Sequence, residues 1–598
     1  MMKMLLRNVT MSELADIYER HQGTSPAPYF CDKKVKERAK HLAQKNGIWE
    51  DLKELDPTRE IPVLKRSDYR SFKRTGDRSI PEAKANYRRG EIERAVLALW
   101  LDHPNADLDY LQDLIWAYCD DWTWVMAAHE SRDVDLGAVR IGRTLAEAVH
   151  IFQNILEEEV KESVYQAVNQ HIFDPARNYR NLDNWYVDRF AWMTARNNWN
   201  HVCNGEIIST ALYLVSDPAA LAHLTHPLIQ NLTYGLDGFA EDGGCLEGPG
   251  YWAYGFGHFL KTAYALHLKT NGEVNIMADE SGKIQRISRF PLATHIDGRL
   301  RATFADSTHG YLPAHATLLA NAFYTMPELY NLCELHPDST LKVKNLHELA
   351  MYSDFKVTSE QPRQDYFLPD MGFVKMHGKP GQNQMTVVCQ AKNNGVSHNH
   401  NDIGSFMVYK HGRLPLVDPG APIYTKKTFG PQRYEIMFCN SFGHSVPVID
   451  GVMQQEGEQY FGSISVENLH KKGTKKAAID MTHAYPEGTV QKFIRTLMLD
   501  TDSNALFIYD TFDFESRGPS SLEESFITFE QVKVSGNTVQ IGPQERSVTL
   551  SAENCSGSFE AVSLDEESKE GKSGEVVTRI KFTPDSLGQT MRLAFKII

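Results

Sequence analysis

The chain has 598 residues, a formal charge of −14 and a hydrophobic fraction of 42%. This length exceeds what one hydrophobic core supports, so we expect two or more domains. The negative charge argues against nucleic acid as a partner, and no apolar run reaches the roughly 18 residues of a membrane span. An acidic polymer would therefore have to meet a locally basic site on this protein.

Eight cysteines are scattered along the chain without any Cys-x-x-Cys pair. This spacing argues against a zinc ribbon and a disulfide scaffold and favours free thiols in a reducing compartment. The opening residues have too short an apolar run for a signal peptide. We therefore predict a cytoplasmic protein, or a periplasmic or secreted one whose leader has been removed.

Two regions of the N-terminal half are predicted to be helical. Residues 1–90 are charged and mixed, which indicates short helices that pack on the next region. Residues 91–352 carry apolar side chains at helical spacing, with breaks at Asp-Pro, Asn-Gly and Pro. Tryptophan and tyrosine are frequent there, and such rings either fill a core or line a sugar-binding cleft.

Residues 353–598 have a different pattern. Apolar or alternating runs at 385–391, 405–410, 505–510 and 547–551 are separated by Gly, Asn and Asp turns. This pattern predicts an antiparallel β region that continues to the C-terminus, with a polar surface loop at 566–575. The predicted fold class is multidomain α+β, with the helices first and the strands second.

Polar side chains gather at a predicted helix start in Arg196-Asn-Asn-Trp-Asn-His-Val-Cys-Asn-Gly-Glu206. Asn198, Asn200, His201 and Asn204 place three amides and an imidazole beside the free backbone N–H groups of the first turn. A single Asn or Gly would be enough to cap the helix. The group therefore exceeds what capping requires.

A Gly- and Pro-rich loop over 241–250 leads into a helix that carries Tyr251 and Tyr254. Because they are three residues apart, these tyrosines would lie on one helix face. A tyrosine near a basic site can act as general acid or base once its pKa is lowered. A buried structural phenol is the alternative, since a phenol ordinarily titrates near 10.

The most informative segment is Ser397-His-Asn-His-Asn-Asp-Ile-Gly-Ser-Phe406. On an extended segment, His398 and His400 would point the same way and face one site. Asp418 follows at the end of the next predicted strand, and His444 lies further along. His400, Asp418 and His444 would supply nitrogen and oxygen ligands for a divalent metal, which leaves His398 for chemistry.

Taken together, these segments resemble the heparinase II/III-like family of polysaccharide lyases, which includes heparin, heparan sulfate and alginate lyases. The resemblance is carried by Asn-Asn-Trp-Asn-His-Val-Cys-Asn-Gly, Glu-Gly-Pro-Gly-Tyr-Trp-Ala-Tyr-Gly, Ser-His-Asn-His-Asn-Asp-Ile-Gly-Ser-Phe and His-Ser-Val-Pro-Val-Ile-Asp-Gly. It implies an N-terminal (α/α) toroid, an incomplete barrel of helical hairpins, over residues 91–352. It also implies a C-terminal antiparallel β-sandwich over residues 353–598, with the active cleft between the two.

The resemblance further implies β-elimination in a uronic-acid polysaccharide, either a glycosaminoglycan such as heparin or heparan sulfate or an alginate-like polymer. A base removes the C5 proton, the carboxylate is neutralised, and an acid protonates the leaving oxygen to give a 4,5-unsaturated product. The catalytic residues that it implies are Asn200, His201, His398 and Tyr254, with Tyr251 as the alternative to Tyr254.

Further roles follow from the same resemblance. The predicted substrate contacts are Asn198, Trp199, Asn204, Glu247 and Arg433; Glu247 departs from the family pattern, which often has a histidine in this loop. His400, Asp418 and His444 would hold a structural metal, with zinc as the first choice, that braces the loop carrying His398. A homodimer is one option for assembly. Two other hypotheses stay open: a zinc-dependent glycan hydrolase, and a non-catalytic glycan-binding protein on the same scaffold.

Overall fold

The computed structural model describes residues 9–178, 184–333, 346–351, 363–515 and 518–598. Its contacts divide the chain into two compact units. Unit 1 comprises Met1–Phe239, Trp252–Gln285 and Tyr311–Ser359, and unit 2 comprises Ala240–Tyr251, Arg286–Gly310 and Glu360–Ile598. Two short segments of the predicted toroid therefore belong with the strands, and the predicted boundary at 352/353 lies outside the described residues.

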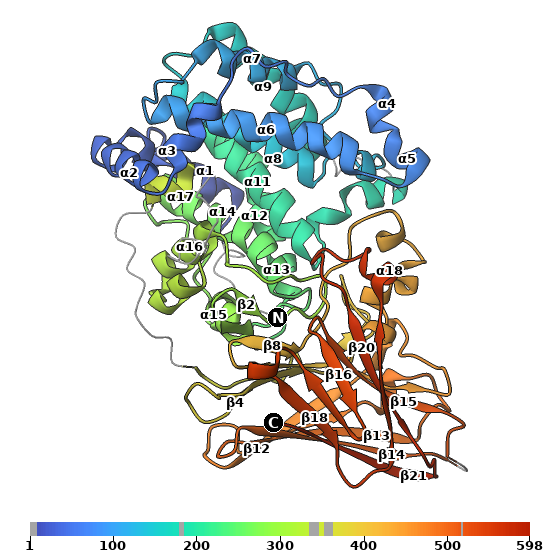
Figure 1. The fold of residues 1–598 in the computed structure, drawn as a ribbon. Helices are drawn as coiled ribbons and strands as arrows, with labels where there is room; N and C mark the ends of the chain where they lie inside the picture. Colours follow the sequence, from blue (N-terminus) through green and yellow to red (C-terminus); the bar gives the residue numbers. More distant parts are fainter. Residues whose placement is uncertain (1–8, 179–183, 334–345, 352–362, 516–517) are drawn as a thin grey trace. The chain divides into compact units, whose positions relative to one another are not determined.

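Unit 1 is helical, and its helices follow one another along the chain (Figure 1). Its described α-helices are α1 (Met11–Arg20), α2 (Lys33–Lys45), α3 (Ile48–Asp51), α4 (Arg66–Tyr69), α5 (Ser71–Thr75), α6 (Ser79–Trp100), α7 (Leu108–Cys119), α8 (Leu136–Phe152), α9 (Glu158–Val168), α10 (Asp174–Asn178), α11 (Asn198–Leu214), α12 (Pro218–Asp237), α14 (Gly257–Lys269), α16 (Ala314–Tyr324) and α17 (Leu346–Met351). No helix in the part of the chain that the structure describes is both long and apolar enough to cross a bilayer.

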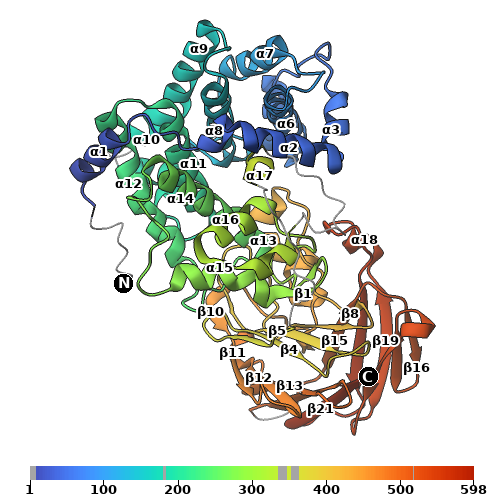
Figure 2. The same ribbon diagram turned by 90° about the vertical axis from the view of Figure 1, so that its left-hand side faces the viewer.

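Helix α11 lies at the centre of unit 1. Every residue of α11 is buried except Trp199 and Tyr213, because α8, α12 and α14 all pack against it (Figure 2). The Asn197 side chain caps its N-terminus by accepting the Trp199 backbone N–H. The polar motif of the sequence thus forms the first turns of a helix that is enclosed on all sides.

Unit 2 contains three large antiparallel sheets. Their strand orders are β11-β12-β13-β14-β21-β18-β17-β16, β3-β4-β5-β7-β8 and β19-β20-β15-β9. The strands are β3 (Tyr366–Leu368), β4 (Phe373–His377), β5 (Thr386–Gln390), β7 (Phe406–Lys410), β8 (Arg413–Leu416), β9 (Val448–Ile449), β11 (Ser463–Glu467), β12 (Thr474–Asp480), β13 (Lys492–Asp500), β14 (Ala505–Asp513), β15 (Leu522–Thr528), β16 (Val532–Ser535), β17 (Thr538–Ile541), β18 (Val548–Ala552), β19 (Gly557–Ser563), β20 (Thr578–Pro584) and β21 (Thr590–Ile597). The predicted runs at 385–391, 405–410, 505–510 and 547–551 correspond to β5, β7, β14 and β18.

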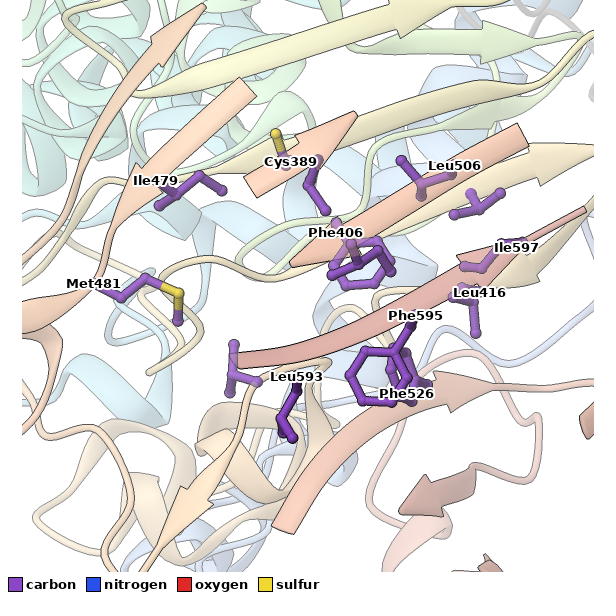
Figure 3. Close-up of a cluster of buried hydrophobic side chains, with 14 of the residues drawn as sticks. Cys389, Phe406, Leu416, Ile479, Met481, Leu506, Phe526, Leu593, Phe595 and Ile597 are labelled. Atoms are coloured by element: carbon purple, nitrogen blue, oxygen red, sulfur yellow. The ribbon is translucent and has the colours of Figure 1, made fainter. Parts of the chain in front are cut away.

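One hydrophobic core joins the three sheets. Strands β12, β13 and β14 bury every second residue, which is the alternation of a sheet with one face in the core. Phe406 of β7, Phe526 of β15 and Phe595 of β21 meet in this core (Figure 3), with ring centroids of Phe526 and Phe595 5.0 Å apart. The predicted α+β class, with a β-sandwich at the C-terminal end, is confirmed.

The five-stranded sheet is buried on both faces. All residues of β4, β5 and β7 are buried, and the segment 286–310 covers the face away from the core. The Lys375 ammonium of β4 donates to the carbonyls of Leu292 and His295, and Phe304 contacts Phe373 edge to face. This segment also contains the β1–β2 hairpin (His295–Asp297 and Leu300–Arg301), and the chain after it enters the candidate site.

A buried ion-pair network ties unit 2 together. The Arg495 guanidinium of β13 donates to Asp510 at 2.9 and 2.7 Å and to Glu524 at 2.7 Å, and it also reaches the carbonyls of Gly404 and Ser445. The side chains of Arg495, Asp510 and Glu524 have no exposed area. One arginine thus connects β13, β14, β15 and the loops that precede β7 and β9.

We predict that Arg495→Met destabilises the protein by about 3–5 kcal/mol, because it leaves two carboxylates buried without a partner. Removal of an exposed ion pair is the matched control: Lys569 and Glu566 are 69% and 81% exposed, so Lys569→Ala should change stability by less than about 1 kcal/mol. Thermal unfolding followed by circular dichroism compares the two. Equal melting temperatures for both variants would contradict the prediction.

Candidate active site

His398 is held in place by its backbone and by its ring. Its φ of +59° is in the left-handed region, which a residue with a side chain occupies only when its surroundings enforce it. The ring stacks on Tyr251 with centroids 4.0 Å apart, and Nδ1 lies 2.7 Å from Asp306 Oδ2. The segment is therefore not extended as the sequence suggested, and His398 is oriented by contacts from other parts of unit 2.

Asp306 is the acceptor that gathers the site. Its carboxylate has no exposed area. Oδ2 accepts from His398 at 2.7 Å and from Tyr424 at 3.1 Å. Oδ1 accepts from His400 at 3.0 Å and from Arg433 at 2.9 Å. Burial alone would raise its pKa, but the hydrogen bonds from the two histidines and the Arg433 charge hold the pKa of Asp306 well below its usual value. His398 and His400 therefore do face one group, as predicted.

The backbone that presents Asp306 is also unusual. Ala305 has a φ of +64°, and the Ser307 N–H donates to the Ala305 carbonyl at 2.6 Å. A non-glycine residue in this region costs free energy of order 1–3 kcal/mol. Two residues with positive φ therefore lie at the hydrogen bond between Asp306 and His398: Ala305, which precedes Asp306 in the chain, and His398 itself.

Two tyrosines extend the hydrogen-bond chain from Asp306. The Tyr424 hydroxyl donates to Asp306 Oδ2, and it lies 2.7 Å from the Tyr251 hydroxyl. A hydroxyl has a single hydrogen, so when Tyr424 donates to Asp306 it can only accept from Tyr251. Burial, together with the Asp306 charge, raises the pKa of Tyr424 far above its usual value, so this phenol stays protonated. A continuous chain therefore runs from Tyr251 to Asp306 and His398.

Tyr254 has different surroundings from Tyr251. Tyr251 ends a short helix, α13 (Pro249–Tyr251), and a π-helical turn over Trp252–Phe256 follows it directly. The Tyr254 ring lies edge-on to His258 in unit 1, and burial raises the pKa of its phenol to about 12. The continuous α-helix expected across both tyrosines is thus replaced by a π-helical turn, which changes the spacing of side chains around the axis, and the two rings have different partners.

Two predicted substrate contacts also lie in this cluster. Arg433 donates to Asp306 and to the carbonyls of Asn399 and Thr428, so its guanidinium is engaged within unit 2. Glu247 lies with Oε1 3.7 Å from His398 Nε2, on the side of the ring away from Asp306. Contact of either residue with a substrate stays a prediction.

The predicted metal ligands lie together next to this cluster. The ligand atoms of His400, Asp402 and His444 are within 4.8 Å of one another, and all three residues are fully buried. His444 Nδ1 lies 3.0 Å from Asp418 Oδ2, while its Nε2 is 3.0 Å from the Phe438 carbonyl. Asp402 thus joins the three predicted residues, and the sequence analysis had not singled it out.

The unpaired atoms of this group test whether a cation fits. His400 Nδ1 and both carboxylate oxygens of Asp402 are buried without a hydrogen-bond partner among the described residues. Both nitrogens of His444 face oxygen acceptors, which a neutral imidazole cannot satisfy. Two imidazoles and two carboxylates, with unmet acceptors on His400 and Asp402, are a suitable donor set for a divalent metal such as zinc. Asp306 would then orient His400 from the opposite ring nitrogen.

The asparagine-rich motif lies in unit 1 and is mostly turned inward. The Asn200 amide donates to the carbonyls of Met193 and Asn231, and the Asn204 amide donates to Met193 and Asn200. His201 Nε2 is 3.2 Å from the Leu232 carbonyl, and burial lowers the pKa of this imidazole to about 3. These side chains brace α11 against its neighbours, and their predicted catalytic roles stay predictions.

The first turn of α11 offers two further candidates. Asn198 is 5% exposed, and the half-buried Trp199 ring lies 4.7 Å from the His129 ring, with the Arg132 guanidinium 4.8 Å from its centroid. The predicted role of Asn198 and Trp199 as substrate contacts is compatible with this placement and stays a prediction.

Sequence reasoning missed Asp306, Tyr424 and Asp402. Asp306 stands in Thr-Phe-Ala-Asp-Ser and Tyr424 in Ala-Pro-Ile-Tyr-Thr, and neither stretch carries a motif that marks it as part of a site. The histidine partners of Asp306 come from positions more than 90 residues away. Asp402 stands inside the motif His-Asn-His-Asn-Asp and could have been considered as a ligand from that position alone.

Comparison with known proteins agrees with this architecture. A family model described as "Heparinase II/III-like, C-terminal" matches residues 360–578. A search of curated proteins returned no match. Among solved structures, heparinase III is similar with a TM-score of 0.58 at 12% identity, over 96% of this chain and 93% of that chain.

Two further structures show the same fold. A heparan sulfate lyase mutant from Pedobacter heparinus is similar with a TM-score of 0.59 at 13% identity, over 98% of this chain and 88% of that chain. A chondroitin AC lyase from Streptomyces coelicolor, solved with chondroitin sulphate, has a TM-score of 0.56 at 10% identity, over 98% and 82%. The helical toroid and β-sandwich are thus shared, and residues 360–578 match a heparinase II/III-like C-terminal domain, which agrees with the resemblance that the motifs indicated.

Proposed function

We propose that this protein is a polysaccharide lyase that cleaves a uronic-acid glycan by β-elimination. The observation that carries the proposal is the cluster in which the Tyr251 ring stacks on His398 while Tyr424 and Asp306 connect the two by hydrogen bonds. It provides a phenol and an imidazole side by side, each held in one orientation. The shared fold with heparin and chondroitin lyases supports the same reaction class.

Tyr251 is the proposed proton-transfer residue. As its phenolate it would take the C5 proton; the C5–H electrons form the C4–C5 double bond, and the bond from C4 to the glycosidic oxygen breaks. The same hydroxyl can then protonate the leaving oxygen when the hydrogen and the leaving group are on one face of the sugar. Tyr424, which keeps its own proton, holds the neutral Tyr251 phenol in place by accepting from it, and its hydrogen would have to turn from Asp306 toward Tyr251 to stabilise the phenolate.

His398 is the proposed partner of the substrate carboxylate. Its Nδ1–H donates to Asp306, so Nε2, which lies 3.7 Å from Glu247 Oε1, can donate to a substrate carboxylate only when the imidazole is protonated at both nitrogens. A donor at this position stabilises the charge that develops next to the carboxylate, a contribution of roughly 3–4 kcal/mol for one good donor. Asn200 of unit 1 is the amide that the motif indicates for the same role, and that role stays a prediction.

The metal is proposed to be structural. His400, Asp402 and His444 are fully buried, whereas a catalytic zinc keeps an open position for water or substrate. This burial supports a bracing role and weighs against the alternative of a zinc-dependent hydrolase. When bound, the metal would satisfy the unpaired oxygens of Asp402 and fix the loop between His398 and His400.

A panel of acidic glycans tests the proposed function. Heparan sulfate, chondroitin sulfate, hyaluronan and alginate are incubated with the protein, and the ultraviolet absorbance of the 4,5-unsaturated product is followed. A rise with at least one uronate glycan is expected. No rise in absorbance with any glycan of the panel, combined with cleavage to saturated fragments, would contradict the proposal.

We predict that Tyr251→Phe lowers kcat by about 10²–10⁴-fold, because it removes the proton-transfer group and keeps the ring. Tyr254→Phe is the matched variant: it removes a phenol of the same type from a site beside His258, and we expect a change of less than about tenfold. Initial rates on the responsive glycan and melting temperatures are compared. A larger loss for Tyr254→Phe would assign the reaction to the other tyrosine.

We predict that Asp306→Asn lowers kcat by about 10²–10⁴-fold with the glycan KM changed much less, because an amide cannot accept from both histidines, Tyr424 and Arg433 together. Asp365→Asn is a matched control, since Asp365 accepts from Lys475 in a different part of unit 2. Steady-state kinetics give both parameters. Normal turnover by Asp306→Asn would contradict the role of this carboxylate.

We predict one tightly bound divalent metal per chain, and its loss from His444→Ala. Metal content is measured by inductively coupled plasma mass spectrometry after dialysis. Removal of the metal with a chelator should lower the melting temperature before it abolishes turnover, because the ligands brace a loop. Immediate loss of activity at an unchanged melting temperature would favour a catalytic metal instead.

A further inference from the structure

Unit 2 contains a cavity of about 810 Å³ beside the β1–β2 hairpin. Its wall is formed by the hairpin and the chain that follows it, by the turn and strand at 412–419, and by residues 529–530 and 572–575. Cavities of roughly 300–1,000 Å³ hold small organic ligands. This one is large enough for a disaccharide.

Two arginines belong to the hairpin side of this cavity. Arg299 lines it directly, and Arg301 lies behind the lining residues Thr308 and His309, with its Nε donating to the Thr308 carbonyl at 2.6 Å. The Arg301 Nη1 is buried without a hydrogen-bond partner. Among the described residues, neither Arg299 nor Arg301 forms an ion pair with a carboxylate.

The titration behaviour of this wall agrees with an excess of positive charge. Burial lowers the pKa of Arg301 to about 10, and no acidic neighbour offsets it. Burial, then the charges of Arg301 and Arg299, lower the pKa of His309 to about 4. A buried cation without a partner is unfavourable, and an anion bound in the cavity would relieve that cost.

The acidic residues around the cavity are already engaged or lie away from the hairpin. Asp418 is 3.0 Å from His444, and Glu530 forms an ion pair with Arg413 at 3.1 Å. Glu575 is exposed on the segment opposite the hairpin. None of the three is within ion-pair distance of Arg299 or Arg301.

The cavity shares a wall with the candidate active site. Lys572 lines the cavity, and its ammonium lies 3.3 Å from the centroid of the Tyr424 ring. Tyr424 is the residue whose hydroxyl connects Tyr251 with Asp306. A ligand in the cavity would therefore lie next to the catalytic cluster, on the far side of Tyr424.

We propose that this cavity binds the sulfate or carboxylate group of an acidic saccharide through Arg299, with the buried Arg301 guanidinium behind the lining adding positive charge. We assign a saccharide as the ligand, in preference to a free ion, because the cavity is large enough for a disaccharide and lies behind Tyr424. The assignment to a glycan rests on the proposed function. The inference that the ligand is an anion does not rest on the proposed function, because it follows from the positive charges of the two guanidiniums alone.

The test measures binding without turnover. Isothermal titration calorimetry at low ionic strength compares a sulfated disaccharide, its desulfated counterpart and inorganic sulfate. The wild type is compared with Arg299→Gln and with Arg299→Gln/Arg301→Gln. Arg592→Gln is the control, since Arg592 is an exposed cation that does not line the cavity. Melting temperatures report on folding.

We expect the wild type to bind the sulfated disaccharide about tenfold more tightly than the desulfated one, and the double variant to lose about tenfold in affinity. Arg592→Gln should bind as the wild type does. Arg299 is exposed, so Arg299→Gln carries the test if the double variant does not fold. Unchanged binding by a folded Arg299→Gln protein and its double variant would overturn the proposal. Equal affinity for inorganic sulfate and the disaccharide would overturn the saccharide assignment.

The two proposals can fail separately. If the glycan panel gives no unsaturated product while binding still depends on Arg299, the lyase proposal fails and the anion site stands. If the panel responds while the arginine variants keep wild-type affinity and wild-type KM for sulfated glycans, the lyase proposal stands and the anion site fails.

Discussion

The buried carboxylate of Asp306 is the contact on which the rest of the candidate site depends. The Asp306 side chain accepts hydrogen bonds from two histidines, a tyrosine and an arginine, and each hydrogen bond fixes a different part of the site. An ionised carboxylate without exposed area is costly unless its lone pairs are satisfied. The four donors meet that requirement, and in return each donor is restricted to one orientation.

This arrangement connects the proposed catalytic residues with the candidate metal ligands through a single residue. Oδ2 orients His398, the ring next to Tyr251, while Oδ1 orients His400, whose other nitrogen faces Asp402 and His444. The carboxylate–histidine–metal pattern is a common way to fix a ligand ring. The left-handed backbone of His398 and Ala305 is tolerated because these contacts outweigh its cost.

The sequence was a good guide wherever local patterns determine the structure. Alternation along 505–510 predicted β14, helical spacing predicted α8 and α11, and the motif at 397–406 marked the loop that carries both histidines. Tyr251 was recognised as an alternative, but sequence spacing could not show the π-helical turn that follows it and contains Tyr254. That turn is set by packing.

Asp306 and Tyr424 could not be found from the sequence for a related reason. Each stands in an ordinary stretch of the chain, and its role arises from partners about 90 to 170 positions away that the fold of unit 2 brings together. Tertiary contacts also explain why the segments 240–251 and 286–310 belong to unit 2 and not to the helical unit. Lys375 and Phe373 of β4, for example, hold the segment 286–310 against the sheet. Contacts of this kind are properties of the tertiary structure.

The most direct test of the account is the fate of water oxygen during cleavage. A responsive uronate glycan is digested in water enriched in oxygen-18, and the fragments are analysed by mass spectrometry. The account predicts fragments that carry a C4–C5 double bond and no label, because Tyr251 moves a proton and no water is added. Incorporation of one labelled oxygen at each cleaved bond would contradict it and assign the site to hydrolysis.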